Sequence, residues 1–188
     1  MPTQSCIKPK IQNISLCPNP EDNLSGYKDY IALALQADVT TMPSRPVYSA
    51  TITGKDYATA VAATPATAFG STAVWGKLEV KEGSLKVVTK PKSNFKDSSA
   101  VVTEITFEVV DNEDNYGYLM LLSNAPLHTV VEKNNGKMLW CGDAGKAAKL
   151  MDVSRENASE KGLISVKIEF GVLSPLYLPS GTTISYVA

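Results

Sequence analysis

The amino-acid sequence predicts a mainly β protein: an antiparallel β-sandwich or barrel-like sheet with one short α-helix and a long extended insert. Three observations carry this prediction, and all lie between Ala100 and Gly181. The first and last segments of this block alternate apolar and polar residues, as half-buried strands do. A short segment between them has a helical period, and an Asn-Asn-Gly turn follows it. A buried parallel sheet would instead show continuous apolar runs.

The first strand of the block is expected from Ala100 to Val110. Successive side chains of a strand point to opposite sides, so one face can be buried and the other wet. The expected buried residues are Val101, Thr103, Ile105, Phe107 and Val109. The last strand, Gly162 to Val172, repeats the pattern with Ile164, Val166, Ile168, Phe170 and Val172.

A short helix is expected from Tyr116 to Leu122. Asp111, Asn112 or Asp114 can cap its exposed amides, and the acidic residues place negative charge at the positive end of the helix dipole. Tyr118, Leu119 and Leu122 would form its apolar stripe, and Asn124 and Pro126 would end it. So short a helix needs tertiary packing, and we expect it to lie across the apolar side of the sheet.

Turn residues predict the remaining strands. Asn134-Asn135-Gly136 tolerates positive φ and predicts a hairpin over Leu127 to Gly142. A second hairpin is expected over Trp75 to Lys90, turning at Lys81-Glu82-Gly83. Two earlier strands are expected at Ile11 to Leu16 and at Tyr27 to Gln36.

The segment from Thr40 to Gly76 contains few charges and many small residues. It is too long for an ordinary connection in a compact domain. Two interpretations remain open: a flexible excursion, or a hairpin whose Ala and Thr side chains pack against something else. A neighbouring subunit is the obvious candidate partner.

The order of these features resembles bacteriophage tail tube proteins and related tail-ring proteins. The features are a strand, a short helix, the NNGK hairpin ending in Cys-Gly, a polar segment, and a long amphipathic strand closed by Pro-Leu-Tyr-Leu-Pro. The resemblance covers Ala100 to Gly181, and Ser25 to Pro43 is similar to the opening strand region of the same class. The insert departs from the family pattern.

The resemblance implies a single domain over residues 1–188, with an N-terminal arm at 1–10 and the insert at 40–76. It also implies a virion protein of the tail or neck, made in the host cytoplasm. Copies would form a closed homo-oligomeric ring, with six or twelve subunits expected, that contacts neighbouring tail, neck or portal-adaptor proteins. Double-stranded DNA would pass through the ring without specific binding. The candidate residues facing the lumen are Glu104, Thr106, Glu108, Lys167 and Glu169. The candidate inter-subunit residues are Tyr48, Ile52, Tyr57, Val61, Phe69 and Trp75.

Composition excludes several other classes. A net charge of −1 and a pI near 5.9 provide no basic field for a tight grip on phosphates. The three cysteines, Cys6, Cys17 and Cys141, are odd in number and lack CxxC spacing, which argues against a zinc site and a disulfide framework. The N-terminus has no apolar signal region, and no run approaches a membrane span, so we expect a protein that is neither exported nor membrane-bound.

Candidate catalytic and metal-binding residues have simpler explanations. The segment Asp111 to Gly117 resembles a calcium loop, but Tyr116 stands where the loop needs Gly, and helix capping explains the cluster better. His128 is the only histidine and is expected to be a half-buried strand residue. Glu104 and Glu108 have Cα atoms about 13 Å apart on one strand, too far for the usual glycosidase pair. They indicate either a solvated sheet face or a lumen surface that repels DNA phosphates.

No nucleophile, zinc, phosphate-binding or dinucleotide motif is present, so we expect neither an enzyme nor a cofactor. Trp140 is expected in the core, and Trp75 either there or at a subunit contact. Two alternatives to a tail ring remain: a capsid-associated decoration protein, and a monomeric β-sandwich module that binds a ligand.

Overall fold

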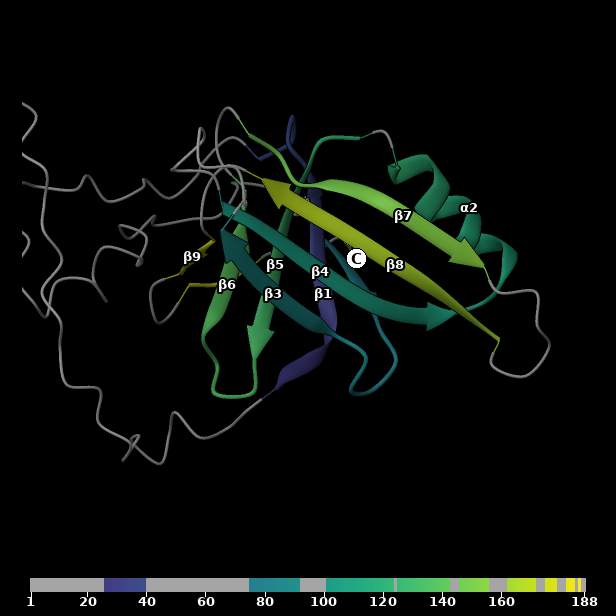
Figure 1. The fold of residues 1–188 in the computed structure, drawn as a ribbon, viewed down its shortest axis with the longest axis horizontal. Helices are drawn as coiled ribbons and strands as arrows, with labels where there is room; N and C mark the ends of the chain where they lie inside the picture. Colours follow the sequence, from purple (N-terminus) through teal and green to yellow (C-terminus); the bar gives the residue numbers. More distant parts are fainter. Residues whose placement is uncertain are drawn as a thin grey trace, which may run out of the picture.

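The protein folds as two antiparallel β-sheets packed face to face, with one short helix beside them in the described part (Figure 1). The computed structural model describes residues 26–39, 75–91, 101–123, 125–142, 146–155, 162–171, 175–178, 182–184 and 186. The N-terminal arm, the strand expected at Ile11 to Leu16 and residues 40–74 of the insert lie outside these ranges. The expected mainly β architecture is confirmed.

One sheet has five strands in the order β2-β1-β5-β6-β9. All its neighbouring strands are antiparallel. Their bounds are β1 Tyr27–Leu35, β2 Gly76–Glu79, β5 Leu127–Lys133, β6 Met138–Cys141 and β9 Leu176–Tyr177.

The other sheet has four strands in the order β3-β4-β8-β7, again all antiparallel. Their bounds are β3 Lys86–Pro91, β4 Val101–Val110, β7 Lys149–Arg155 and β8 Leu163–Gly171. In Figure 1 these strands lie in front and cross those of the five-stranded sheet at a steep angle.

Strands β4 and β8 have the alternation that the sequence predicts. They pair without interruption from Val102 opposite Gly171 to Val110 opposite Leu163. The expected inward residues from Thr103 to Val109 and from Ile164 to Phe170 are buried, Val101 is half-buried, and Val172 lies outside the described residues. One face of this sheet is therefore apolar and the other is open to water.

The helix α2 spans Glu113–Leu122, so it begins one turn earlier than expected. Asn112 is its N-cap, and its side chain accepts a hydrogen bond of 2.7 Å from the backbone N–H of Asn115. The acidic segment thus caps the helix as predicted. Leu119 and Leu122 are buried, but Tyr118 is 44% exposed, so its assignment to the apolar stripe was wrong.

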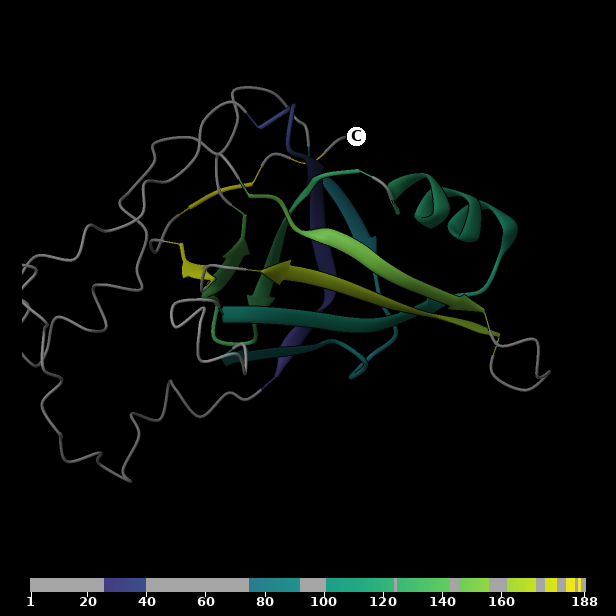
Figure 2. The same ribbon diagram turned by 45° about the horizontal axis from the view of Figure 1, so that its top comes forward.

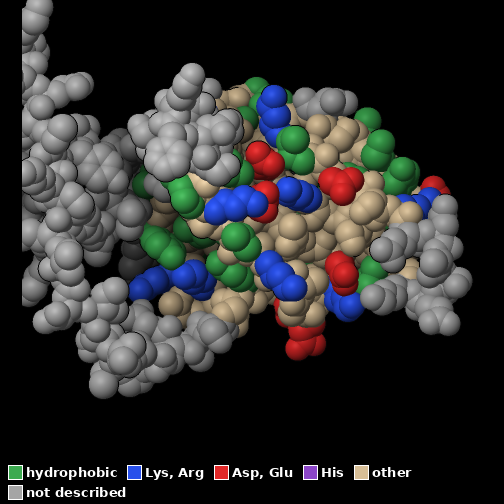
Figure 3. Space-filling view, viewed as in Figure 1, with side chains coloured by type: hydrophobic (Ala, Val, Ile, Leu, Met, Phe, Trp, Pro, Cys, Tyr) green, Lys and Arg blue, Asp and Glu red, His purple; other side chains and the backbone are tan. Residues whose placement is uncertain are grey.

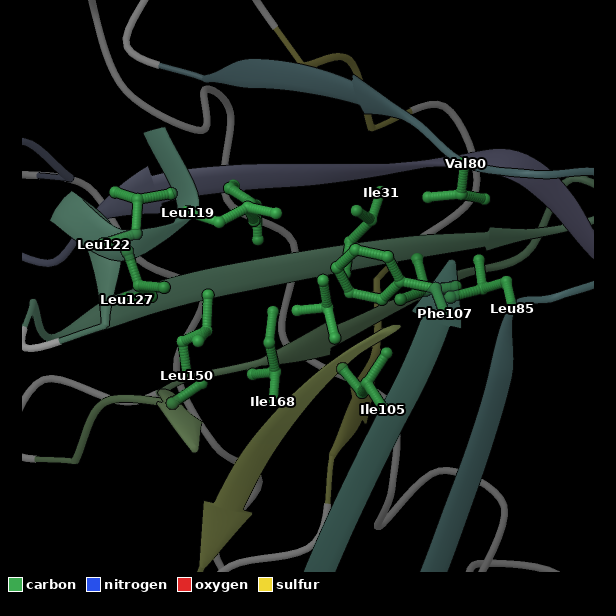
Figure 4. Close-up of a cluster of buried hydrophobic side chains, with 14 of the residues drawn as sticks. Ile31, Val80, Leu85, Ile105, Phe107, Leu119, Leu122, Leu127, Leu150 and Ile168 are labelled. Carbon is green, nitrogen blue, oxygen red and sulfur yellow. The ribbon is translucent and has the colours of Figure 1, made fainter. Parts of the chain in front are cut away.

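Figures 1 and 2 place α2 beside β7, at one side of the sandwich. Its buried leucines join the core between the sheets, where Figure 4 shows them close to Leu127 and Leu150. The helix therefore closes a side of the core. The expectation that it lies across the apolar side of the sheet was wrong.

The hairpin of β5 and β6 is confirmed. Gly136 has a φ of 79°, and its N–H donates to the carbonyl of Lys133. The hairpin expected over Trp75 to Lys90 is wrong, because β2 pairs with β1 and β3 pairs with β4. The predicted turn does form, with Gly83 at φ 71°, but it carries the chain from one sheet to the other.

Main-chain hydrogen bonds tie the two sheets together at two places. The Lys81 N–H donates to the carbonyl of Glu108 at 2.7 Å, which joins the end of β2 to β4. Leu127 and Ala148 exchange two bonds of 2.9 and 2.7 Å, which join β5 to the start of β7. These ties make the sandwich barrel-like.

Two apolar clusters stabilise the fold. The main cluster fills the space between the sheets, where Ile31, Ile105, Phe107 and Ile168 point toward one another (Figure 4). The second lies on the other side of the five-stranded sheet and contains Trp75, Trp140, Val130, Leu176 and Leu178. Strand β1 from Ile31 to Ala34 and strand β5 from Leu127 to Glu132 are therefore buried on both faces, which explains the apolar run of β1. No helix in the described ranges is both long and apolar enough to span a bilayer.

Candidate functional site

The outward side of the four-stranded sheet carries all five residues predicted to face a lumen. Glu104, Thr106 and Glu108 project from β4, and Lys167 and Glu169 project from β8. In the strand register Glu104 lies opposite Glu169, and Thr106 lies opposite Lys167. The structure thus brings these five residues together on one face.

This face carries both signs of charge. Strand β3 adds Lys86 and Lys90 beside β4, and strand β7 adds Lys149 and Asp152 beside β8. Figure 3 views this side of the molecule and shows lysines and carboxylates interspersed across it. The surface therefore does not carry charge of one sign only, and we call it the mixed-charge face.

Glu104 is at the centre of the ion pairs on the mixed-charge face. Its Oε1 atom accepts from Lys90 Nζ at 3.0 Å and from Lys167 Nζ at 3.1 Å. These hydrogen bonds, with that of Lys90 the stronger, hold the pKa of the Glu104 carboxyl below its usual range. The two lysines are thereby drawn toward a carboxylate of their own sheet.

A hollow of about 500 Å³ lies on the mixed-charge face beneath the β2–β3 turn. The turn is fixed by Ser84, whose Oγ donates to the carbonyl of Lys81 at 2.6 Å and accepts from the Glu108 N–H at 3.1 Å. Lys81 Nζ lies 3.0 Å from Glu108 Oε2 across the rim. The charged lining residues are three lysines and three carboxylates: Lys81, Lys86, Lys167, Glu82, Glu108 and Asp152. This balance gives the hollow no strong preference for an anion or a cation.

The candidate chemical groups elsewhere have structural roles. His128 is fully buried rather than half-buried, with its ring centroid 5.8 Å from that of Trp140. Asp111 and Glu113 each accept from Arg155 at 2.9 Å, so the acidic segment ties α2 to β7. Within the described ranges, no group of three or more His, Cys, Asp or Glu residues could hold a metal ion. Cys141 is a buried cysteine on β6.

Among the inter-subunit candidates, only Trp75 lies in a described range. It is fully buried in the second apolar cluster, so of its two interpretations the structure supports a place in the protein's own core. Tyr48, Ile52, Tyr57, Val61 and Phe69 lie outside the described residues.

Sequence reasoning missed strand β7, which forms one edge of the sheet. Its register with β8 shifts between Leu150 and Asp152, so Met151 is an extra residue that is 57% exposed. The bulge interrupts the alternation of apolar and polar residues, so the sequence pattern does not indicate a strand here. The apolar residues Leu150 and Val153, three positions apart, are the part of the pattern that could have indicated it.

The β3 edge of this sheet is exposed, whereas α2 lies beside β7 and Ala148, just before β7, is bonded to Leu127 of β5. No other described strand pairs with the outer side of β3 or of β7. In β3, all residues but Val87 are exposed.

Comparison of the chain with protein-family models, with curated proteins and with solved structures finds no match to any of the three.

Proposed function

We propose that this protein is a structural protein of a bacteriophage tail or neck, and that its copies form a closed ring around passing DNA. The observation that supports this proposal is the four-stranded sheet, whose edge strands β3 and β7 each pair with only one described strand. Exposed strand edges invite pairing with another chain, and closure into a barrel removes them. A contact repeated around a rotation axis closes in the same way.

The strand directions allow such closure. Because the sheet has an even number of alternating strands, β3 and β7 run in opposite directions. A copy rotated about an axis along the strands would present its β3 antiparallel to β7 of the first copy. The sheet would then continue from subunit to subunit with one hydrogen-bonding pattern.

The dimensions suit a DNA channel. Six copies would supply about 24 strands, and at about 4.8 Å between strands the barrel would be about 37 Å across before tilt widens it. Twelve copies would double this diameter. The mixed-charge face would line the channel, and Lys90 and Lys167, drawn to Glu104, would hold phosphates weakly.

Particle mass tests the ring. We expect the purified protein to scatter light as a hexamer or dodecamer of the 20.1 kDa chain, and to form annuli in negative stain. Deleting Thr51 to Ala73 is expected to abolish assembly and leave the fold intact. A protein that stays monomeric at high concentration would instead be a binding module, and one that appears on capsid surfaces would be a decoration protein.

Cysteine accessibility tests which face lines the channel. In a Cys6→Ser and Cys17→Ser background, we expect Ser165→Cys on the mixed-charge face to react with a small maleimide but not with a bulky polymer maleimide in the ring. Lys137→Cys in the β5–β6 turn is the control and should react with both. Equal reaction of Ser165→Cys with both reagents would place this face outside the ring.

A further inference from the structure

The β5–β6 turn contains the only Asn-Gly pair of the sequence, Asn135 and Gly136. In such a pair the backbone nitrogen of the glycine can bond to the side-chain amide carbon of the asparagine, because this closes a five-membered ring. A side chain on the second residue would hinder the closure, and glycine has none. Gly136 is exposed, and a Cβ atom there would meet nothing within 4 Å, so neighbouring groups leave this residue open to water.

The geometry of the hairpin requires this glycine. Gly136 has a φ of 79°, a conformation that residues with a side chain rarely adopt, and its N–H donates to the carbonyl of Lys133 at 2.9 Å. The Lys133 N–H donates in turn to the carbonyl of Lys137 at 2.8 Å, which closes the hairpin. The residue that the turn needs after Asn135 is therefore also the one that hinders ring closure least.

Another hydrogen bond restrains the Asn135 side chain. Its Oδ1 atom accepts from the Lys137 N–H at 3.1 Å. The loop of atoms that this bond closes contains both the Asn135 Cγ atom and the Gly136 nitrogen, so the side-chain amide is restrained near that nitrogen. A donor at Oδ1 also draws electron density from Cγ, and it would stabilise the negative charge that Oδ1 gains when a nucleophile attacks.

We propose that Asn135 is a modification site, at which the folded protein converts asparagine to aspartate and isoaspartate without an enzyme. The Gly136 nitrogen, after losing its proton to hydroxide, bonds to the Asn135 Cγ atom. The bond from Cγ to Nδ2 breaks, and Nδ2 takes a proton from water and leaves as ammonia. Water then opens the cyclic imide. Cleavage between Cγ and the nitrogen gives aspartate, and cleavage between the main-chain carbonyl carbon and the nitrogen gives isoaspartate. One water is consumed, one ammonia is released, and nothing is oxidised or reduced.

The hydrogen bond from Gly136 to Lys133 controls the rate. It holds the proton on the attacking nitrogen, so the reaction proceeds only when the turn opens. An exposed turn belongs to the less stable parts of a fold and opens without global unfolding. The rate should rise in proportion to the hydroxide concentration. A synthetic peptide covering Lys133 to Met138 should react faster than the protein, and an equal rate would overturn this control.

The two products would affect the hairpin differently. Aspartate keeps an oxygen that can accept from the Lys137 N–H, and its added negative charge changes the formal net charge from −1 to −2. Isoaspartate routes the main chain through its Cβ atom and so lengthens the turn by one atom. The bond between Gly136 and Lys133 would then lose its geometry, and with it the turn that joins β5 to β6.

Peptide mapping by mass spectrometry tests the modification in the full-length protein. After incubation at mildly alkaline pH, we expect the peptide that contains Asn135 to gain one mass unit, and fragmentation to show isoaspartate there. Asn112 and Asn115 are internal controls, because Glu113 and Tyr116 follow them in the chain. Both should stay unchanged. If Asn135 converts no faster than these two residues, the proposed site is overturned.

Asn135→Gln is the matched variant, because its longer side chain would have to close a less favourable six-membered ring. Isoelectric focusing should show an acidic species that accumulates in the unaltered protein and is absent from the variant. If Asn135→Gln lowers the melting temperature, Asn135→Ser serves instead, since serine is common in turns and has no amide carbon. The reaction needs no second subunit, so the result is independent of the proposed ring. Equal amounts of the acidic species in the unaltered protein and in both variants would overturn the assignment to Asn135.

Discussion

The Tyr30 hydroxyl donates a hydrogen bond to the Glu132 carboxylate, which joins β1 to β5 on the outward side of the five-stranded sheet. Glu132 is only 8% exposed, and Lys28 also pairs with it. Tyr186 packs edge-on against the Tyr30 ring at 6.5 Å between centroids. A nearly buried carboxylate is thus held by partners from its own sheet.

Tyr30→Phe is expected to destabilise the protein by about 1 to 2 kcal/mol, because the nearly buried carboxylate loses a donor. The phenyl ring would keep its contact with Tyr186. Chemical denaturation at pH 7 measures the loss. Tyr118→Phe, at a tyrosine that is 44% exposed, is the control and should unfold at the unaltered denaturant concentration.

Acid should weaken the same interaction. Burial by itself raises the pKa of Glu132, but hydrogen bonds from Lys28 and Tyr30 offset this and hold the pKa below its usual value. A lowered pKa in the folded state contributes stability above about pH 4.3, the ordinary pKa of glutamate. This contribution is lost as the pH falls through the lower folded-state value. Denaturation midpoints between pH 6 and pH 2 should show a smaller acid loss in Glu132→Gln than in the unaltered protein.

Gly142→Ala is expected to destabilise the fold by about 1 to 3 kcal/mol through overpacking. An added Cβ atom would collide with the buried imidazole of His128 and approach the indole of Trp140. Thermal unfolding followed by tryptophan fluorescence would report the change, because Trp140 and Trp75 are both buried in the second apolar cluster. Gly171→Ala, where a Cβ meets nothing within 4 Å, should melt near the unaltered temperature. A normal melting temperature for Gly142→Ala would contradict the close packing.

Asn112→Ala should cost about 1 kcal/mol, because the N-cap acceptor of α2 is lost. Asn112→Asp keeps an acceptor at the cap and should retain the stability. Amide exchange at Asn115, whose N–H donates to the cap, would show whether the first turn has frayed. Equal exchange in the alanine and aspartate variants would argue against this cap.

Arg155→Met removes the ion pairs that join β7 to α2. Hydrogen bonds to Asp111 and then to Glu113 raise the pKa of Arg155 above its usual value, so the guanidinium stays charged. We expect a lower melting temperature at low salt and a smaller difference at high salt, where exposed charges are screened. Lys149→Met, at an exposed lysine of the same strand, is the control for charge removal.

The elements that the sequence predicted well are those whose local pattern agrees with their final environment. β4 and β8 alternate because one face is buried, and Asn134-Asn135-Gly136 supplies the positive φ that its turn requires. Asn112 begins α2 by local hydrogen bonding alone. Local chemistry decides these features, so they can be read from short windows.

The features that could not be predicted depend on contacts between distant residues. The turn at Gly83 is local, but whether its flanking strands pair with each other depends on β1 and β4. The bulge at Met151 concealed β7, and the charge of the candidate lumen face depends on lysines from β3 and β7. The burial of His128 likewise follows from the second apolar cluster around Trp140.

The position of β8 between β4 and β7 has a consequence for the order of events during synthesis. Strand β7 leaves the ribosome before β8, and in the described sheet β8 is its only partner. Until β8 is made, β3 and β4 can form a hairpin, but β7 has no sheet to join. The β7 edge therefore forms last, and the two edges proposed to meet in the ring are both present only after β8 is made, which limits premature association between nascent chains.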